Sequence, residues 1–212
     1  MFGLTLANLP YLLLVVLPIG LMAVTVHEVS HGYVAYRFGD PTAHDMGRLT
    51  LNPLAHLDPI GTLMIFLIGF GWARPVPVNP AYFRNRGKGM MWVALAGPIA
   101  NILMAVTAAL LLRAVFYLPN EYWQPLIRFF RFGITINVVL AAFNMIPIPP
   151  LDGSRVVAFL LPPGLAAGYQ EMERYGLIIL LAVLFLLPWL TGVDIVRIVA
   201  SAALKAFYAI MF

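Results

Sequence analysis

The sequence predicts an all-α polytopic membrane protein with about four to six transmembrane helices. Hydrophobic residues make up 62% of the 212 residues and charged residues only 10%, whereas soluble domains average about 25% charged residues. Several apolar stretches approach or exceed the ~20 residues that a helix needs to cross the hydrocarbon core. No polar domain separates these stretches. We therefore expect one membrane-embedded domain over residues 1–212, with a motif-bearing core at about 9–153 and C-terminal helices at about 154–212.

The first expected span runs from about Leu9 to Phe38. At 1.5 Å per residue it is too long to cross a ~30 Å core perpendicularly, so its polar last turns should reach the far interface or a cavity. It lacks a basic leading region and a small-residue cleavage site, so we do not expect a signal peptide that is removed.

The next segments combine polar loops with short apolar runs. After the polar stretch from Gly39 to Asp58, an apolar run from Pro59 to Trp72 is short for a crossing and suits a re-entrant or interfacial segment. Ala73 to Pro80 reads ARPVPVNP, whose prolines exclude a helix and favour extended backbone. Such backbone at membrane depth must be buried in protein or line a wet cavity. We expect it to form a short extended or β element near an active site.

Three further spans are expected at about Gly89 to Phe116, Ile127 to Met145 and Tyr175 to Leu190. The stretch before the last of them contains the Pro-Pro-Gly run 162–164 and should be looser. The tail from Asp194 to Phe212 is apolar with a sparse polar face. It could lie along the interface or cross as a fifth span, and the sequence leaves both alternatives open.

Basic residues are distributed unevenly between the two sides of the membrane. If the run from Pro59 to Trp72 does not cross, eight basic residues lie on one side and three on the other; the eight are Arg37, Arg48, Arg74, Arg84, Arg86, Lys88, Arg155 and Arg174, and the three are Arg113, Arg128 and Arg131. The excess predicts that the eight-residue side is cytoplasmic. A net charge of +4 is then explained by loop charges, and we expect no nucleic-acid partner.

The segment HEVSH, His27 to His31, carries the strongest chemical signal. Histidines four residues apart on a helix can both direct a ring nitrogen at one metal ion. Glu28 lies beside them, where its carboxylate can take a proton from water that the metal acidifies. The pattern also occurs by chance, but ionisable groups in a membrane helix cost about 2 to 3 kcal/mol each unless they are paired or ligated. The segment therefore predicts metal-assisted hydrolysis.

A catalytic zinc site needs three protein ligands, and with no cysteine in the chain the third must be His, Asp or Glu. Asp152 stands out, because Pro147, Pro149 and Pro150 interrupt the third span just before it and Gly153 follows. Non-helical backbone at membrane depth is tolerated around functional cavities. The alternative is that Asp152 caps the helix that follows.

These motifs together resemble the site-2 protease family of intramembrane metalloproteases. Beside HEVSH, the stretch NMIPIPPLDG at 144–153 has every fixed position of the family's second motif, and GPIAN at 97–101 and GRLTLNPLAHLDPIGT at 47–62 resemble the short prokaryotic members. The similarity runs from about Val24 to Gly153. It implies one zinc ion per chain, with roles for five residues: metal ligation by His27, His31 and Asp152, water activation by Glu28, and substrate orientation or oxyanion stabilisation by Asn144.

The resemblance implies cleavage of peptide bonds in or near transmembrane segments of membrane proteins, in a multi-pass protein of a prokaryotic cell (inner) membrane. We recognise no inserted PDZ domain and no C-terminal nucleotide-sensing domain, so loops or an outside partner should select substrates. The expected partners are a transmembrane protein substrate and membrane lipid, and the oligomeric state is open. The alternatives are a divalent-metal transporter and an inactive relative that only binds membrane proteins.

Several polar residues have less certain roles. Asn144 could instead cap carbonyls freed by Pro147. His44 and His56 could lie near the metal, but a lone histidine in a loop is usually solvated, and we expect that of both. Gly97 and Asn101 should allow close helix approach and an interhelical hydrogen bond.

Overall fold

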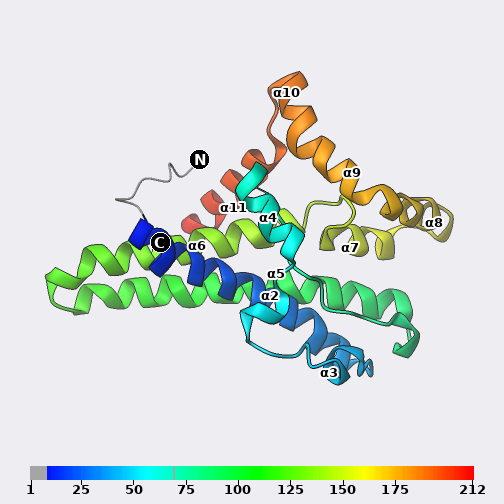
Figure 1. Ribbon diagram of the computed structural model, residues 1–212, viewed down its shortest axis with the longest axis horizontal. Helices are drawn as coiled ribbons and strands as arrows, with labels where there is room; N and C mark the ends of the chain where they lie inside the picture. Colours follow the sequence, from blue (N-terminus) through cyan, green and yellow to red (C-terminus); the bar gives the residue numbers. More distant parts are fainter. Residues whose placement is uncertain (1–8, 69) are drawn as a thin grey trace.

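The computed structural model describes residues 9–68 and 70–212, and in these ranges the chain is helical with no sheet (Figure 1). The only pairing outside helices in this part is an isolated antiparallel bridge between Leu57 and Ala73. The α-helices are α1 (Leu9–Tyr11), α2 (Leu17–Arg37), α3 (Thr42–Asp45), α4 (Pro59–Ile68), α5 (Arg86–Ala114), α6 (Trp123–Asn144), α7 (Asp152–Leu160), α8 (Pro163–Glu171), α9 (Gly176–Leu181), α10 (Leu187–Thr191) and α11 (Ile195–Met211). Short 3₁₀ or π turns extend them at Leu12–Val16, Pro53–His56, Pro80–Tyr82, Val115–Tyr117, Asn120–Tyr122, Met172–Tyr175 and Ala182–Leu186.

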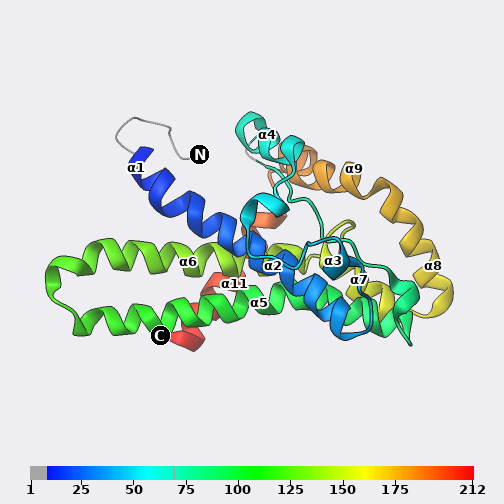
Figure 2. The ribbon, with the colours of Figure 1, turned by 60° about the horizontal axis from the view of Figure 1, so that its bottom comes forward.

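Two long antiparallel helices, α5 and α6, form the frame of the molecule (Figures 1 and 2). Helix α5 has 29 residues, which is about 43 Å at 1.5 Å per residue and longer than the hydrocarbon core. Asn85 starts it by accepting a hydrogen bond from the Lys88 amide, 2.9 Å away. Both helices match the predicted second and third spans to within a few residues. Helix α2 crosses this pair diagonally and packs against α5.

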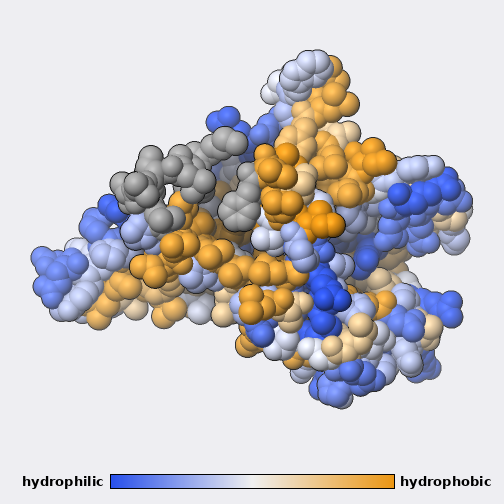
Figure 3. Space-filling view, in the orientation of Figure 1, coloured by the Kyte–Doolittle hydropathy of each residue, from blue (hydrophilic) through white to orange (hydrophobic). Residues whose placement is uncertain are grey.

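Four continuous helical stretches are long and apolar enough to cross a membrane: Leu12–Arg37, Arg86–Tyr117, Asn120–Asn144 and Pro163–Thr191. In Figure 3, hydrophobic residues lie mainly between hydrophilic surfaces at the two ends of the long axis, which is the pattern expected for helices that cross a bilayer. The fourth stretch starts earlier than predicted. We expected a looser segment at 162–164, and this was wrong from Pro163 onward, because proline is well accommodated in the first turn of a helix, where its missing N–H is not needed.

The C-terminal helix α11 lies against the α5–α6 pair. Phe207 is buried in one apolar cluster with Ala105 and Leu112 of α5 and Ile134 of α6. The Arg113 guanidinium also donates a hydrogen bond to the carbonyl of Met211. This helix is therefore joined to the core of the bundle, while its position relative to the bilayer stays a prediction.

Between α2 and α5 we predicted a re-entrant or interfacial segment at 59–72 and a short extended or β element at 73–80. Residues 59–68 form the short helix α4, whose ten residues span about 15 Å; that it re-enters the membrane stays a prediction. The expected β element is not seen as a strand in the described residues. Ala73 makes the isolated bridge, and the backbone from Arg74 to Val78 is neither helix nor strand.

Candidate metal centre

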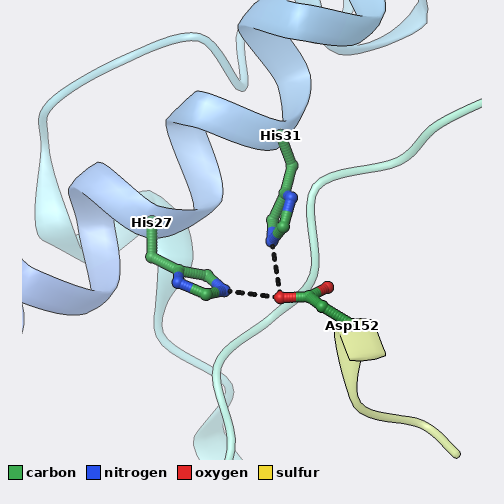
Figure 4. A group of neighbouring side chains, drawn as sticks. All are labelled: His27, His31 and Asp152. Atoms are coloured by element: carbon green, nitrogen blue, oxygen red, sulfur yellow. Dashed lines mark hydrogen bonds and ion pairs between the residues drawn. The ribbon is translucent and has the colours of Figure 1, made fainter. Parts of the chain in front are cut away.

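Helix α2 places His27 and His31 one turn apart on the face that packs against α5. Both are buried, and their ring centroids are 4.6 Å apart at an interplanar angle of 85°. Helical spacing therefore produces the arrangement that the HEVSH segment predicted, with both rings facing the interior (Figure 4).

Asp152 reaches these rings from a distant part of the chain. Helix α6 ends at Asn144, and after the proline-containing segment α7 begins at Asp152. A Cβ at Gly153 would lie 2.3 Å from the carbonyl oxygen of Met145. Only glycine fits such a close backbone approach, and it lets the chain turn back so that the carboxylate faces α2.

The three side chains converge on one point (Figure 4). Asp152 Oδ2 lies 3.1 Å from Nε2 of His27 and 3.3 Å from Nε2 of His31, and the three ligand atoms all lie within 4.8 Å of one another. Ligand atoms about 2.0–2.1 Å from one zinc ion at tetrahedral angles are separated by about 3.3 Å. The donor set and its spacing thus fit zinc. The alternative role of Asp152 as a helix cap is wrong, since the cap residue is Leu151 and no side chain caps the helix.

The other nitrogen of each ring also has a partner. Nδ1 of His31 lies 2.6 Å from the carbonyl oxygen of Val93, and Nδ1 of His27 lies 2.6 Å from Oδ1 of Asn101. Both partners accept hydrogen bonds, so Nδ1 carries the hydrogen in the neutral rings and the Nε2 lone pairs face Asp152. The Nε2 atoms and the carboxylate need a cation between them, either a proton on Nε2 or a metal ion, and three such ligand atoms around one point suit a metal.

The charge of Asp152 suits a metal ligand. Burial raises the pKa of its carboxyl. When the rings of His27 and His31 are protonated, the hydrogen bonds that they donate to the carboxylate and their positive charge lower this pKa by more than burial raises it. The net pKa lies well below the usual range of an aspartate. The group is therefore ionised, which is the form that binds a metal.

Gly97 of α5 lies against the rings of His27 and His31. A Cβ there would lie 2.6 Å from Nε2 of His27 and 2.6 Å from Nε2 of His31. The expected close helix approach is confirmed, and the structure adds that a side chain at this position would collide with both ligand nitrogens.

Glu28 is half-buried beside the histidines, and it accepts a hydrogen bond from the segment at 74–79. The Val76 amide donates to its Oε2 at 3.0 Å. Two charged side chains hold the same segment: the Arg48 guanidinium donates to the Arg74 carbonyl at 2.9 Å, and the Asn79 amide donates to buried Asp40 at 2.6 Å. The segment at 74–79 is thus fixed at three points, one of them the predicted general base.

The remaining predicted residues have different outcomes. His44 is exposed and paired with its neighbour Asp45, as expected for a solvated histidine. The same expectation for His56 is wrong: it is buried at 1% exposure, and its Nε2 donates to the Thr50 carbonyl at 2.9 Å. The 3₁₀ turn Pro53–His56, capped by Asn52, directs this ring inward.

Asn144 is the last residue of α6, and its Nδ2 donates to the Leu140 carbonyl at 3.0 Å. Its role toward substrate stays a prediction. The interhelical hydrogen bonds expected of Asn101 are confirmed, since it reaches both α2 and α6. Sequence reasoning missed its partner, Asn137. The sequence feature that could have identified Asn137 is its polar amide in the middle of an apolar span.

Comparison with known proteins agrees with this geometry. The family model described as "Peptidase family M50" matches residues 14–187. The chain belongs to peptidase family M50. The predicted resemblance to site-2 proteases is therefore confirmed, and with its four apolar helices this M50 member is an integral membrane protein.

Individual relatives are similar over most of the chain. The M50 chain is 43% identical over 187 residues to "Putative zinc metalloprotease YwhC" of Bacillus subtilis, covering 86% of this chain and 83% of that protein. It is 32% identical over 174 residues to "Putative zinc metalloprotease Rip2" of Mycolicibacterium smegmatis, covering 77% of this chain and 64% of that protein. "Zinc metalloprotease MJ0392" of Methanocaldococcus jannaschii is 24% identical over 182 residues, covering 85% of this chain and 44% of that protein. No solved structure matches the chain significantly.

Proposed function

We propose that this zinc metalloprotease is an endopeptidase that cleaves peptide bonds in or near transmembrane segments of membrane proteins. The observation that carries the proposal is the position of the metal centre. Its two histidines lie within a helix long and apolar enough to cross a membrane, and its aspartate lies eight residues after the last residue of another such helix. A hydrolytic centre at that depth suits substrates that are themselves embedded in the bilayer.

The ligands would be His27, His31 and Asp152, with Glu28 as the general base. Zinc bound there would supply Lewis acidity that polarises a peptide carbonyl and acidifies water. Glu28 accepts the proton of the attacking water and delivers it to the leaving amine nitrogen. The hydrogen bond from the Val76 amide holds its carboxylate in place for both transfers.

Asn144 would donate its amide to the carbonyl oxygen of the substrate, where negative charge develops during attack. At present its Nδ2 donates to the Leu140 carbonyl. The NH2 group has a second N–H, which could donate to bound substrate while the first hydrogen bond orients the amide.

A transmembrane helix protects its peptide bonds by its own hydrogen bonds, so cleavage requires local unwinding. We propose that the extended segment at 74–80 holds the unwound peptide by β-addition. A cavity of about 420 Å³ continues from this segment toward α7, with Val78, Met90, Ser154 and Arg155 among its lining residues. It offers room for the polar flank of a substrate. The whole chain would act as a single protease domain in a prokaryotic inner membrane. The side of the membrane that bears the metal centre would face the cytoplasm.

A divalent-metal transporter is the main rival function. Such a protein needs polar groups along an ion pathway through several helices. In the described residues, one group of His and carboxylate side chains is close enough together to hold a metal ion: His27, His31 and Asp152. An inactive relative is disfavoured because the ligands and Glu28 are all present in a plausible hydrolytic arrangement.

The test is cleavage of a single-span model substrate by the purified full chain, with zinc content measured in parallel. Glu28→Gln should abolish cleavage and retain zinc, whereas His27→Ala should lose both. Glu121→Gln is a matched control, because Glu121 is an exposed carboxylate in the distant loop between α5 and α6. Cleavage that survives Glu28→Gln, or zinc flux that is insensitive to it, would refute the proposal.

A further inference from the structure

Two buried asparagines are hydrogen-bonded to each other inside the helix bundle. Asn101 of α5 has 0% exposure and Asn137 of α6 has 2%. Polar amides in membrane-spanning helices are costly unless their hydrogen bonds are satisfied. Their presence in the core therefore requires a structural or functional reason.

Their hydrogen bonds form one chain with a defined direction. Asn137 Nδ2 donates to the Gly133 carbonyl of its own helix at 2.9 Å. Its Oδ1 is then left to accept from Asn101 Nδ2 at 2.8 Å. Asn101 Nδ2 also donates to the Ala23 carbonyl of α2 at 3.1 Å. With both donors of its amide used in this way, Asn101 presents its oxygen to His27.

The opposite orientation of Asn101 is excluded by these neighbours. A rotated amide would set its oxygen against two acceptors, the Ala23 carbonyl and Asn137 Oδ1, and would offer a donor to His27 instead. Main-chain carbonyls on two different helices thus decide which atom of Asn101 faces the ring.

We propose that Asn101 and Asn137 are positioning residues that hold His27 in the tautomer able to bind zinc. Asn101 Oδ1 lies 2.6 Å from Nδ1 of His27 and so keeps the hydrogen there, which frees Nε2 for the metal. Asn137 acts on His27 indirectly, because it accepts a hydrogen bond from Asn101 and so fixes the orientation of the Asn101 amide. The inference rests on the zinc site of the proposed function but not on its substrate.

The two histidines differ in the group that accepts the hydrogen bond from Nδ1. His31 receives the same support from the main-chain carbonyl of Val93, which no side-chain substitution removes. His27 depends on a side chain and on that side chain's neighbour. Zinc affinity should therefore respond to residues 101 and 137 although neither binds the metal.

The experiment measures zinc affinity of the full chain in detergent by competition with a chromophoric chelator, and the absorption spectrum of the cobalt-substituted protein. Asn101→Leu removes the acceptor and should weaken zinc binding by about 10- to 100-fold, the range usual for such partners of metal ligands. Asn101→Asp keeps an acceptor toward His27, although it loses the donor to the Ala23 carbonyl and Asn137, and should therefore bind zinc more tightly than Asn101→Leu. Asn137→Leu should weaken binding by a smaller factor and shift the cobalt spectrum in the same direction as Asn101→Leu.

A double-mutant cycle separates positioning from general destabilisation. Since Asn137 acts through Asn101, Asn137→Leu should have no further effect on affinity in the Asn101→Leu background. Val138→Ala is the control, because Val138 is buried next to Asn137 and carries no polar group; it should lower thermal stability and leave affinity and spectrum unchanged. If a leucine variant does not fold, Asn101→Ser and Asn137→Ser replace it, since serine can bond its own helix carbonyl but does not reach the partner.

Unchanged zinc affinity and cobalt spectrum in the residue-101 variants would overturn the inference, as would fully additive effects of the two substitutions. The two proposals can fail separately. If the wild-type chain binds zinc and the residue-101 and residue-137 variants bind it more weakly as expected, but the wild-type chain cleaves no membrane substrate, the proposed function is refuted and this inference is supported. A wild-type chain that binds no zinc would overturn both.

Discussion

Gly97 of α5 lies so close to His27 of α2 that a Cβ at residue 97 would be 2.6 Å from the ring nitrogen Nε2. The same Cβ would be equally close to Nε2 of His31. At residue 97 there is therefore room for a hydrogen atom but not for a methyl group. This contact connects the packing of two membrane helices directly to the metal centre.

Gly97→Ala is expected to remove zinc binding, because its methyl group must displace either helix α5 or both rings. Zinc content of the purified variant measures this, and cleavage should be lost with it. Gly20→Ala is the matched control, since a Cβ at Gly20 meets nothing within 4 Å and alanine favours a helix over glycine by about 1 kcal/mol. Normal zinc content in Gly97→Ala would contradict the geometry.

Gly153→Ala should displace the third ligand. The added Cβ would lie 2.3 Å from the Met145 carbonyl oxygen, so the backbone that carries Asp152 must move. We expect zinc affinity to fall by at least the ~10- to 100-fold usual when the partner of a metal ligand is lost, as read by chelator competition. Gly164→Ala, where a Cβ meets nothing within 4 Å, should be neutral, and equal behaviour of the two variants would count against the prediction.

Arg48→Met should affect catalysis more than zinc binding. The substitution removes the hydrogen bond from the guanidinium to the Arg74 carbonyl, and a hydrogen bond from a charged group is worth about 1.5–3 kcal/mol. The extended segment loosens, and with it the Val76 amide that holds Glu28. The expected result is a lower kcat with full zinc content, measured beside Arg84→Met, an exposed arginine. Loss of zinc from Arg48→Met would show that the segment supports the metal ligands instead.

His56→Ala should destabilise the protein without changing the metal centre. The ring is buried and donates to the Thr50 carbonyl, so its removal leaves a cavity and an unpaired carbonyl, at a cost of about 1–3 kcal/mol. Thermal unfolding in detergent should show a lower midpoint, with unchanged zinc per chain. His44→Ala serves as the control, since that ring is exposed, and a zinc deficit in His56→Ala would assign His56 to the site.

Much of the metal centre was predictable because its signals are local. The four-residue spacing of His27 and His31 acts within one helix turn, and the prolines before Asp152 mark broken backbone in the chain itself. The helices that cross the core were also predictable, since hydropathy and length act over about twenty neighbouring residues. The start of the fourth span was misjudged because Pro163 was assigned to a looser stretch, whereas it begins helix α8.

Sequence by itself determined the membrane class, the family motifs and the two histidines on one helix face. Only the tertiary structure decided what surrounds them: the Val93 carbonyl on one ring, the Asn101–Asn137 pair on the other, Gly97 between them and the buried position of His56. Apart from the local hydrogen bond of His56, the hydrogen bonds among them join residues that are 36 to 74 positions apart in the chain. They depend on how α2, α5 and α6 cross, which no local pattern specifies, because side chains that are close in space are set by packing rather than by spacing along the chain.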